Sequence, residues 1–243
     1  MRDLIRADLK RIYRVGLIYG GLVFALLYIY FKVLEGVVND GSIGFVNGVQ
    51  AALGGAPMAI FIVFPAFYAV FAHELSSKSM QTVLGHGITR EKLIIAKLLD
   101  AAILLFSVYL VIIATAFIAM NTESAVVLST QQQADLIIFI LLRWLRHFGY
   151  IVFSAMIMYI SGITVLGIIA CIAFTVVFRL VFNVLEFFLS LSIYDYTFDG
   201  LLDWAYTGIE VGAVAWQLIP AVFYLLAALM VTVYFFRRKE FDF

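Results

Sequence analysis

The stretch that decides the fold is Leu98–Met120, which reads LLDAAILLFSVYLVIIATAFIAM. An apolar run of this length matches the roughly 20 residues that an α-helix needs to cross the hydrocarbon core of a bilayer. The rest of the chain has the same character, because 65% of its 243 residues are hydrophobic and only 13% are charged. In soluble domains about half of the residues are apolar and about a quarter are charged. The sequence therefore predicts a polytopic membrane protein.

Further apolar runs along the chain set the number of spans. At about 20 residues per span plus connecting loops, the chain has room for roughly six. The six predicted spans lie at about 15–31, 57–72, 98–120, 136–160, 163–191 and 211–236. The alternation of apolar and polar residues that marks a membrane β-barrel does not recur, so the spans are predicted to be helices. The expected fold class is an all-α polytopic membrane protein, with residues 1–243 forming a single transmembrane domain.

Two connections between these spans carry turn residues. The segment 32–57 is rich in glycine and is predicted to be a loop. The pair Ser161–Gly162 is predicted to form a tight turn between the fourth and fifth spans.

Positive charges predict the orientation of the chain. Most of the 16 Lys and Arg residues fall in the segments 1–14, 73–97 and 237–239, whereas the remaining loops are mainly acidic. Cytoplasmic loops of membrane proteins carry an excess of Lys and Arg. Six spans with both termini in the cytoplasm satisfy this distribution.

The first residues of the chain form a basic amphipathic pattern. Arg2, Arg6, Lys10 and Arg14 follow one another at steps of four, and apolar residues fill the other face. This pattern is typical of a helix that lies in the membrane interface. A solvated basic start that only orients the first span would give the same pattern, and the sequence leaves both interpretations open.

The longest water-compatible run between two apolar blocks is His73–Lys97, HELSSKSMQTVLGHGITREKLIIAK. Thr89, followed by Glu91 and Lys92, predicts the start of a helix whose free N–H groups the Thr side chain caps. A short helix across the ends of two spans would offer a docking surface to a soluble partner.

The order of residues in this loop resembles the permease subunits of type-2 ATP-binding-cassette (ABC) exporters. The shared order is a Glu, a variable linker, Thr-x-Leu, Gly-Ile-Thr/Ser-Arg and a Lys, here Glu74, Thr82–Leu84, Gly87–Arg90 and Lys97. The six-span layout resembles the family more loosely. In that family the loop is a coupling helix that docks into a cleft of the ATPase subunit, and an elbow helix precedes the first span as residues 1–14 do here.

The resemblance implies roles for individual residues and for partners. Met80, Gln81, Val83 and Leu84 would form the docking face, with Glu74 and Arg90 fixing the loop. The chain would work as a homodimer, or as a heterodimer with a related permease, together with two copies of a separate ATPase that binds ATP and Mg. The expected cargo is an amphipathic or hydrophobic substrate, with a peptide favoured, as in bacterial lantibiotic and drug export. The expected location is a bacterial cell membrane.

Polar residues inside the predicted spans are candidates for function, because charges in a bilayer are costly. Arg179, Asn183 and Glu186 share one helix face. Two interpretations are open. The three residues form a polar stripe on a translocation path or at a dimer interface, or they form an ion pair with one another and have only a structural role. Arg143 and Arg146 lie in an apolar run whose first part is interpreted as an oblique or interfacial helix. They either snorkel to lipid headgroups or contact an anionic or peptide substrate.

The sequence offers no catalytic motif. No Gly is followed by Lys, so a phosphate-binding loop is missing and ATP hydrolysis would belong to another chain. His73–Glu74 is followed by Ser77 where a zinc-protease motif needs His, and the Gly-x-Ser-x-Gly nucleophile motif is also missing. Cys171 is the single cysteine, so a metal-binding cysteine cluster is excluded. We expect no metal, no cofactor and no enzymatic activity in this chain. We also expect no nucleic-acid partner.

Three other functions compete with the exporter hypothesis. An ATPase-independent secondary transporter would show inverted repeats and broken helices, and the two halves of the sequence show no clear similarity. A membrane sensor subunit is a further possibility. An intramembrane enzyme would need a polar cluster from several spans, and only the fifth predicted span offers one.

Overall fold

The structure is a computed structural model that describes residues 5–6, 9–10, 12–13, 16–54, 56–72, 88–122, 127–189, 192–207 and 214–238. Its secondary structure is 93% helical, and no strand occurs in the described part of the chain. The helices are α2 (Gly16–Gly54), α3 (Ala56–Phe71), α5 (Arg90–Thr122), α6 (Thr130–Ser161), α7 (Thr164–Ile172), η1 (Ala173–Val177), α8 (Phe178–Leu189), η2 (Tyr194–Tyr196), α9 (Phe198–Thr207) and α10 (Val214–Arg238).

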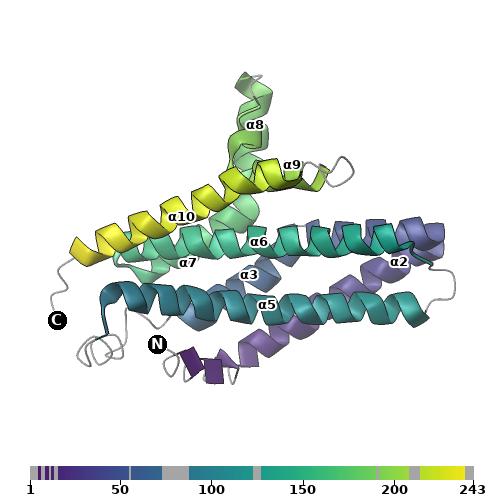
Figure 1. Ribbon diagram of the computed structural model, residues 1–243, viewed down its shortest axis with the longest axis horizontal. Coiled ribbons are helices and arrows are strands. Elements are labelled where there is room, and N and C mark those ends of the chain that lie inside the picture. Colours follow the sequence, from purple (N-terminus) through teal and green to yellow (C-terminus); the bar gives the residue numbers. More distant parts are fainter. Residues whose placement is uncertain are drawn as a thin grey trace.

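The helices form an elongated bundle around α6, which contacts α2, α3, α5, α7, α9 and α10. In Figure 1, α5 and α6 run side by side along the long axis, and α10 lies across α6. One large apolar core joins α2, α3, α5, α6 and α10, with Phe45, Phe67 and Tyr159 among its fully buried side chains. Helix α8 stands away from the bundle (Figure 1), and none of its residues is buried.

In the described part of the chain, four helices are long and apolar enough to cross a membrane: Arg90–Ile118, Thr130–Ser161, Thr164–Leu189 and Leu218–Arg238. A fifth candidate is the pair Gly44–Gly54 and Met58–Phe71, which is bent by 46°. These helices confirm the prediction of a helical protein with several apolar segments long enough to span a membrane. The first predicted span, 15–31, is represented by the shorter apolar helix Gly20–Tyr30.

The predicted loop at 32–57 is wrong in its extent, because helical residues continue up to Gly54, although the chain reverses direction between Val33 and Gly48. Helix α2 nevertheless turns back on itself. A Cβ atom on Gly48 would lie 2.8 Å from the carbonyl oxygen of Lys32 and 3.2 Å from the Cα of Val33. In a straight helix residues this far apart would be separated by about 24 Å at 1.5 Å per residue. The two arms of α2 therefore pack antiparallel, and a glycine at the contact permits the close approach.

This packing predicts opposite effects for alanine at two glycines of α2. Gly48→Ala should lower the free energy of unfolding by about 1–3 kcal/mol, because the new methyl group meets backbone atoms of the opposite arm. Gly20→Ala should leave stability unchanged or raise it by about 0.4–1 kcal/mol, because a Cβ there meets nothing within 4 Å. Unfolding of the two variants in a denaturing-detergent titration measures the difference. Equal stabilities would contradict the antiparallel packing of the arms.

The start of α6 differs from the prediction. The helix begins at Thr130, ahead of the predicted 136–160, because Ser129 and Gln132 form a reciprocal capping box. It continues without a break to Ser161, which agrees with the prediction of one long helix here; the oblique or interfacial placement of its first part stays a prediction. The predicted tight turn after it is confirmed, since Gly162 has a φ of 75° and donates its N–H to the carbonyl of Met158.

The fifth predicted span is not one regular helix. Helix α7 passes into the π-helical turn η1, and α8 then leaves the bundle. Such π-turns are often found at functional sites. Helix α9, which follows, packs against α6, and the charged residues of α6, α8 and α9 lie near one another there.

Candidate functional site

The centre of the site is an ion pair between Arg146 of α6 and Asp199 of α9. Both side chains are deeply buried, with exposed fractions of 5% and 3%, and Arg146 Nε donates to Asp199 Oδ1. The hydroxyl of Tyr150 donates to the same oxygen at 2.5 Å, and the hydroxyl of Tyr194 donates to Asp199 Oδ2 at 2.8 Å. Buried charges persist in proteins when they are paired and hydrogen-bonded. The site meets both conditions at Asp199.

The protonation of Asp199 follows from these contacts. Burial alone would raise its pKa, but the positive charge of Arg146 and the hydrogen bonds from Arg146, Tyr150 and Tyr194 outweigh burial and hold the pKa below the ordinary value for Asp. Burial also raises the pKa of the Tyr194 hydroxyl, which therefore keeps the proton that it donates. Asp199 is thus a carboxylate at neutral pH and is not poised to exchange protons.

A second carboxylate, Asp203, is shared by three arginines. Arg146 Nη1 donates to Asp203 Oδ1 at 2.7 Å. Arg143 Nη1 lies 3.4 Å from the same oxygen, and Arg179 Nη1 lies 3.9 Å from Oδ2. Three guanidinium groups therefore face two carboxylates, and the cluster carries a surplus of one positive charge.

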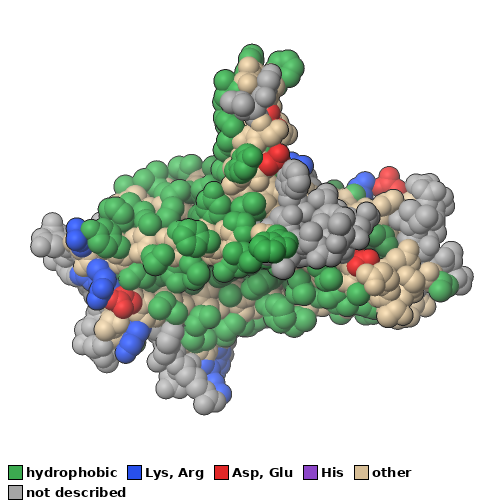
Figure 2. Space-filling model, turned by 45° about the horizontal axis from the view of Figure 1, so that its top comes forward, with side chains coloured by type: hydrophobic (Ala, Val, Ile, Leu, Met, Phe, Trp, Pro, Cys, Tyr) green, Lys and Arg blue, Asp and Glu red, His purple; other side chains and the backbone are tan. Residues whose placement is uncertain are grey.

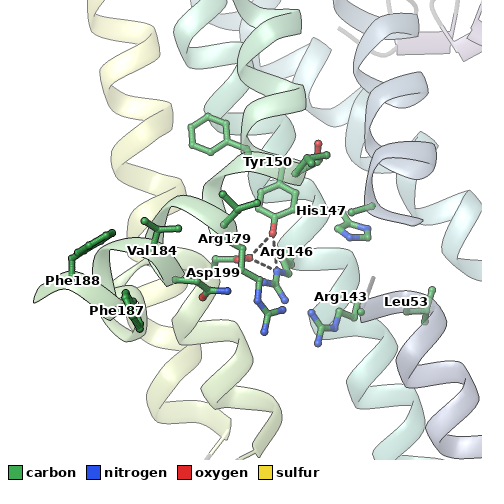
Figure 3. A pocket seen from close by; sticks show the side chains of 17 residues that line it. Leu53, Arg143, Arg146, His147, Tyr150, Arg179, Val184, Phe187, Phe188 and Asp199 are labelled. Atoms are coloured by element: carbon green, nitrogen blue, oxygen red, sulfur yellow. Dashed lines mark hydrogen bonds and ion pairs between the residues drawn. The ribbon is translucent and has the colours of Figure 1, made fainter. Parts of the chain in front are cut away.

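A cavity of about 580 Å³ lies beside this cluster. Figure 3 shows Arg143, Arg146 and Asp199 on one side, with Arg179 between them and Val184, Phe187 and Phe188 of α8 on the other. The remaining lining comes from η1, α6, further residues of α8, the end of α2 and Ala59 of α3. One wall is therefore cationic and the other is apolar, an arrangement suited to binding a ligand that carries both kinds of surface.

A second polar contact adjoins the cluster inside the bundle. His147 is buried, and its Nδ1 lies 2.7 Å from the hydroxyl of Tyr109 on α5. The polar cluster therefore draws on α5, α6, α8 and α9, and the expectation that only the fifth predicted span contributes polar groups is wrong. Among the described side chains, no group of three or more His, Cys, Asp or Glu is placed to hold a metal ion.

The predicted polar stripe of the fifth span is only partly found at this site. Arg179 and Asn183 line the cavity, whereas Glu186 is not among the lining residues. The ion-pair partner of Arg179 is Asp203 of α9, and not a neighbour on its own helix. The interpretation of Arg179, Asn183 and Glu186 as an internally paired set therefore needs correction, because the chain turns between α8 and α9 and supplies the partner from outside.

Arg143 and Arg146 were also predicted as candidates, and both belong to the cluster. Snorkelling to lipid headgroups is excluded for Arg146, whose guanidinium is buried against Asp199. Arg143 is largely buried, with 12% of its side chain exposed, and it stacks over the ring of Phe139 with 5.1 Å between its Cζ and the ring centroid.

The aspartates and tyrosines of the site were missed by sequence reasoning. Asp199 and Asp203 fall in one of the mainly acidic loops between the predicted spans, although their spacing of four places them on one helix face. Arg143 and Arg146 lie three residues apart in an apolar run, where they need counter-charges. The pair of aspartates on one helix face is the sequence signal that could have linked the two segments.

The predicted coupling residue Arg90 is the first residue of α5 and contacts the end of α10. Its Nη1 donates to the carbonyl oxygens of Phe236 at 3.1 Å and Arg237 at 3.3 Å, and its guanidinium lies over the Phe236 ring. Glu91 forms an ion pair with Arg237 at 2.6 Å. The predicted cap at Thr89 is confirmed, since its Oγ1 accepts from the N–H of Lys92. The other predicted coupling residues, Glu74, Met80, Gln81, Val83 and Leu84, lie outside the described residues.

Comparison with known proteins adds no family to these observations. No protein-family model, no curated protein and no solved structure matches this chain.

Proposed function

We propose that this chain is the transmembrane permease subunit of a type-2 ABC exporter. It would couple ATP hydrolysis on a separate ATPase subunit to the export of an amphipathic or hydrophobic substrate. The observation that best supports this proposal is Arg90, the last residue of the Gly-Ile-Thr-Arg motif, which hydrogen-bonds the final turn of α10. The end of the proposed coupling loop is thereby joined to two candidate spans.

The contacts around Arg90 suggest how a push on the loop would travel. The last carbonyl groups of a helix have no hydrogen-bond donors within the helix. Arg90 donates to two of these carbonyl groups at the end of α10. The ion pair from Glu91 to Arg237 holds the same two helix ends together. Helix α10 in turn packs on α6 and α9, which carry Arg146 and Asp199. Closure of the ATPase dimer on nucleotide would thus move α5 and α10 together and reach the walls of the cavity.

The proposed assembly contains two permease copies and two ATPase copies in a bacterial cell membrane. Each permease would have six spans, an interfacial helix at 1–14 and both termini in the cytoplasm. In support of this orientation, Figure 2 shows Lys and Arg side chains gathered mainly at the end where α5 begins and α10 finishes. An excess of positive residues is typical of the cytoplasmic side.

Single cysteines test this orientation and the docking surface. Cys171 is buried and is the one cysteine of the chain, so an added cysteine is the accessible thiol. Val127→Cys, at a position 81% exposed before α6, should react with a membrane-impermeant maleimide on intact cells. Leu84→Cys should react only after permeabilisation, and a thiol-directed cross-linker at that position should capture an ATPase. Labelling of both positions from the same side would contradict the proposal.

An ATPase-independent secondary transporter is the second candidate, because one observation favours it. Broken helices near the substrate site are typical of such transporters, and the candidate span Thr164–Leu189 is interrupted by η1 beside the charged cavity. A membrane sensor subunit has no comparable support. A transporter of this kind would export or import without a partner ATPase, so the cross-link at position 84 separates the two.

A further inference from the structure

The cavity beside Arg143, Arg146 and Arg179 has a cationic surface and an apolar surface. A ligand with a negative charge and an apolar chain would fit both. We propose that the cavity binds an anionic amphiphile, with a phosphate or carboxylate headgroup held by Arg143 and Arg179 and an apolar chain lying along α8. The binding itself rests only on the cavity. Its role as exported cargo rests on the function proposed above.

The charge of the cluster favours an anion at this place. Arg146 is fully engaged by the two aspartates. Arg143 and Arg179 stand 3.4 and 3.9 Å from Asp203, beyond the 2.7–3.2 Å of ordinary N–H···O hydrogen bonds. Among the described residues, Asp203 is the one carboxylate within ion-pair distance of either side chain. Their donors therefore remain available to a ligand.

The geometry of these donors selects the type of headgroup. A guanidinium group presents a planar fork of N–H donors that matches the oxygens of a carboxylate or phosphate. Arg143 of α6 and Arg179 of α8 both line the cavity, and Figure 3 shows Arg146 lying between them. A headgroup between them would be held from two helices and would neutralise the surplus positive charge of the cluster.

The opposite wall suits an apolar partner. Val184, Phe187 and Phe188 line the cavity from α8, and the two phenylalanines are 82% and 75% exposed. Figure 2 shows hydrophobic side chains over much of the projecting α8. An inorganic anion would leave this wall uncovered, whereas an alkyl or acyl chain attached to the headgroup would cover it. The cavity volume of about 580 Å³ lies within the range of about 300–1,000 Å³ that is usual for small-molecule sites.

Calorimetric titration of the full chain in a neutral maltoside detergent tests the proposal. The probes are dodecyl phosphate, dodecyltrimethylammonium and inorganic phosphate, so that charge and chain are varied separately. The test variant is Arg179→Gln, whose side chain is 55% exposed in the native protein and outside the buried ion pair. The matched control is Arg238→Gln, which removes an exposed arginine from the far end of α10.

Dodecyl phosphate should bind saturably, and Arg179→Gln should weaken its binding about tenfold, since a hydrogen bond to a charged group is lost. Arg238→Gln should leave the affinity unchanged within about twofold. Phe188→Asn should also weaken the binding, because the chain loses its apolar contact. Neither dodecyltrimethylammonium nor inorganic phosphate should compete.

Three results would overturn the proposal: competition by dodecyltrimethylammonium, an affinity unaffected by Arg179→Gln, or binding of inorganic phosphate as tight as that of dodecyl phosphate. A further arm separates two sources of the ligand. If nanodiscs containing phosphatidylglycerol abolish dodecyl phosphate binding, the occupant is a bilayer lipid, and if binding persists, it is a single-chain amphiphile. Because no ATPase is present in this assay, failure here leaves the proposed exporter function standing, and success here does not depend on it.

Discussion

Replacing Asp199 with alanine is expected to lower the free energy of unfolding by about 3–5 kcal/mol. The substitution leaves the Arg146 guanidinium, whose side chain is 5% exposed, without its main counter-charge in the interior. It also removes the acceptor for the hydroxyls of Tyr150 and Tyr194. The midpoint of unfolding in a denaturing-detergent titration measures the loss.

The matched control is Asp135→Ala, because Asp135 accepts a hydrogen bond only from Gln131 of the same helix at an exposed position. Its effect should stay within about 0.5 kcal/mol. The double variant with Arg146→Met and Asp199→Leu should recover much of the stability that Asp199→Ala loses, because it removes both buried charges. If Asp199→Ala were no more destabilising than Asp135→Ala, the ion pair would not be a stabilising centre of the fold.

The second large effect is expected at Arg90. In the proposed complex, Arg90→Met should leave the permease assembled with its ATPase but reduce the stimulation of ATP hydrolysis about tenfold. Methionine keeps an apolar contact with the Phe236 ring and loses the hydrogen bonds to the carbonyls of Phe236 and Arg237. The measurement is the ATPase rate of the reconstituted complex relative to that of the ATPase alone.

Arg238→Met is the control for this experiment, since Arg238 is exposed and stacks over Tyr234 on its own helix. It should retain the stimulation of the unsubstituted chain. Full stimulation with Arg90→Met would show that the link between α5 and α10 does not transmit the motion of the loop.

Several elements of the fold were readable from the sequence because local patterns determine them. The apolar run Leu98–Met120 lies within α5, and the Thr89 cap marks the start of that helix. The left-handed conformation of Gly162 is one that glycine adopts without strain, which made the turn after α6 predictable. The glycine-rich segment 32–57 misled the prediction, because low helix propensity was outweighed by the packing of the two arms of α2.

The partners at the site were not readable from a single sequence. Arg146 and its partner Asp199 are 53 residues apart, and no local pattern states which carboxylate an isolated arginine will meet. The expectation that Arg179 pairs on its own helix failed because η1 and the turn after α8 redirect the chain. Sequence reasoning thus found the three arginines but not the aspartates that hold them.

The central claim is that a separate ATPase works with this chain, and purification of the tagged chain from its native membrane in mild detergent tests it most directly. Mass spectrometry identifies the proteins that co-elute, and an ATPase assay measures their activity. The proposal predicts a stoichiometric cytosolic ATPase that is lost with Leu84→Asp, a variant of the proposed docking face. Recovery of the chain alone and without ATPase activity, under conditions that preserve known membrane complexes, would contradict it.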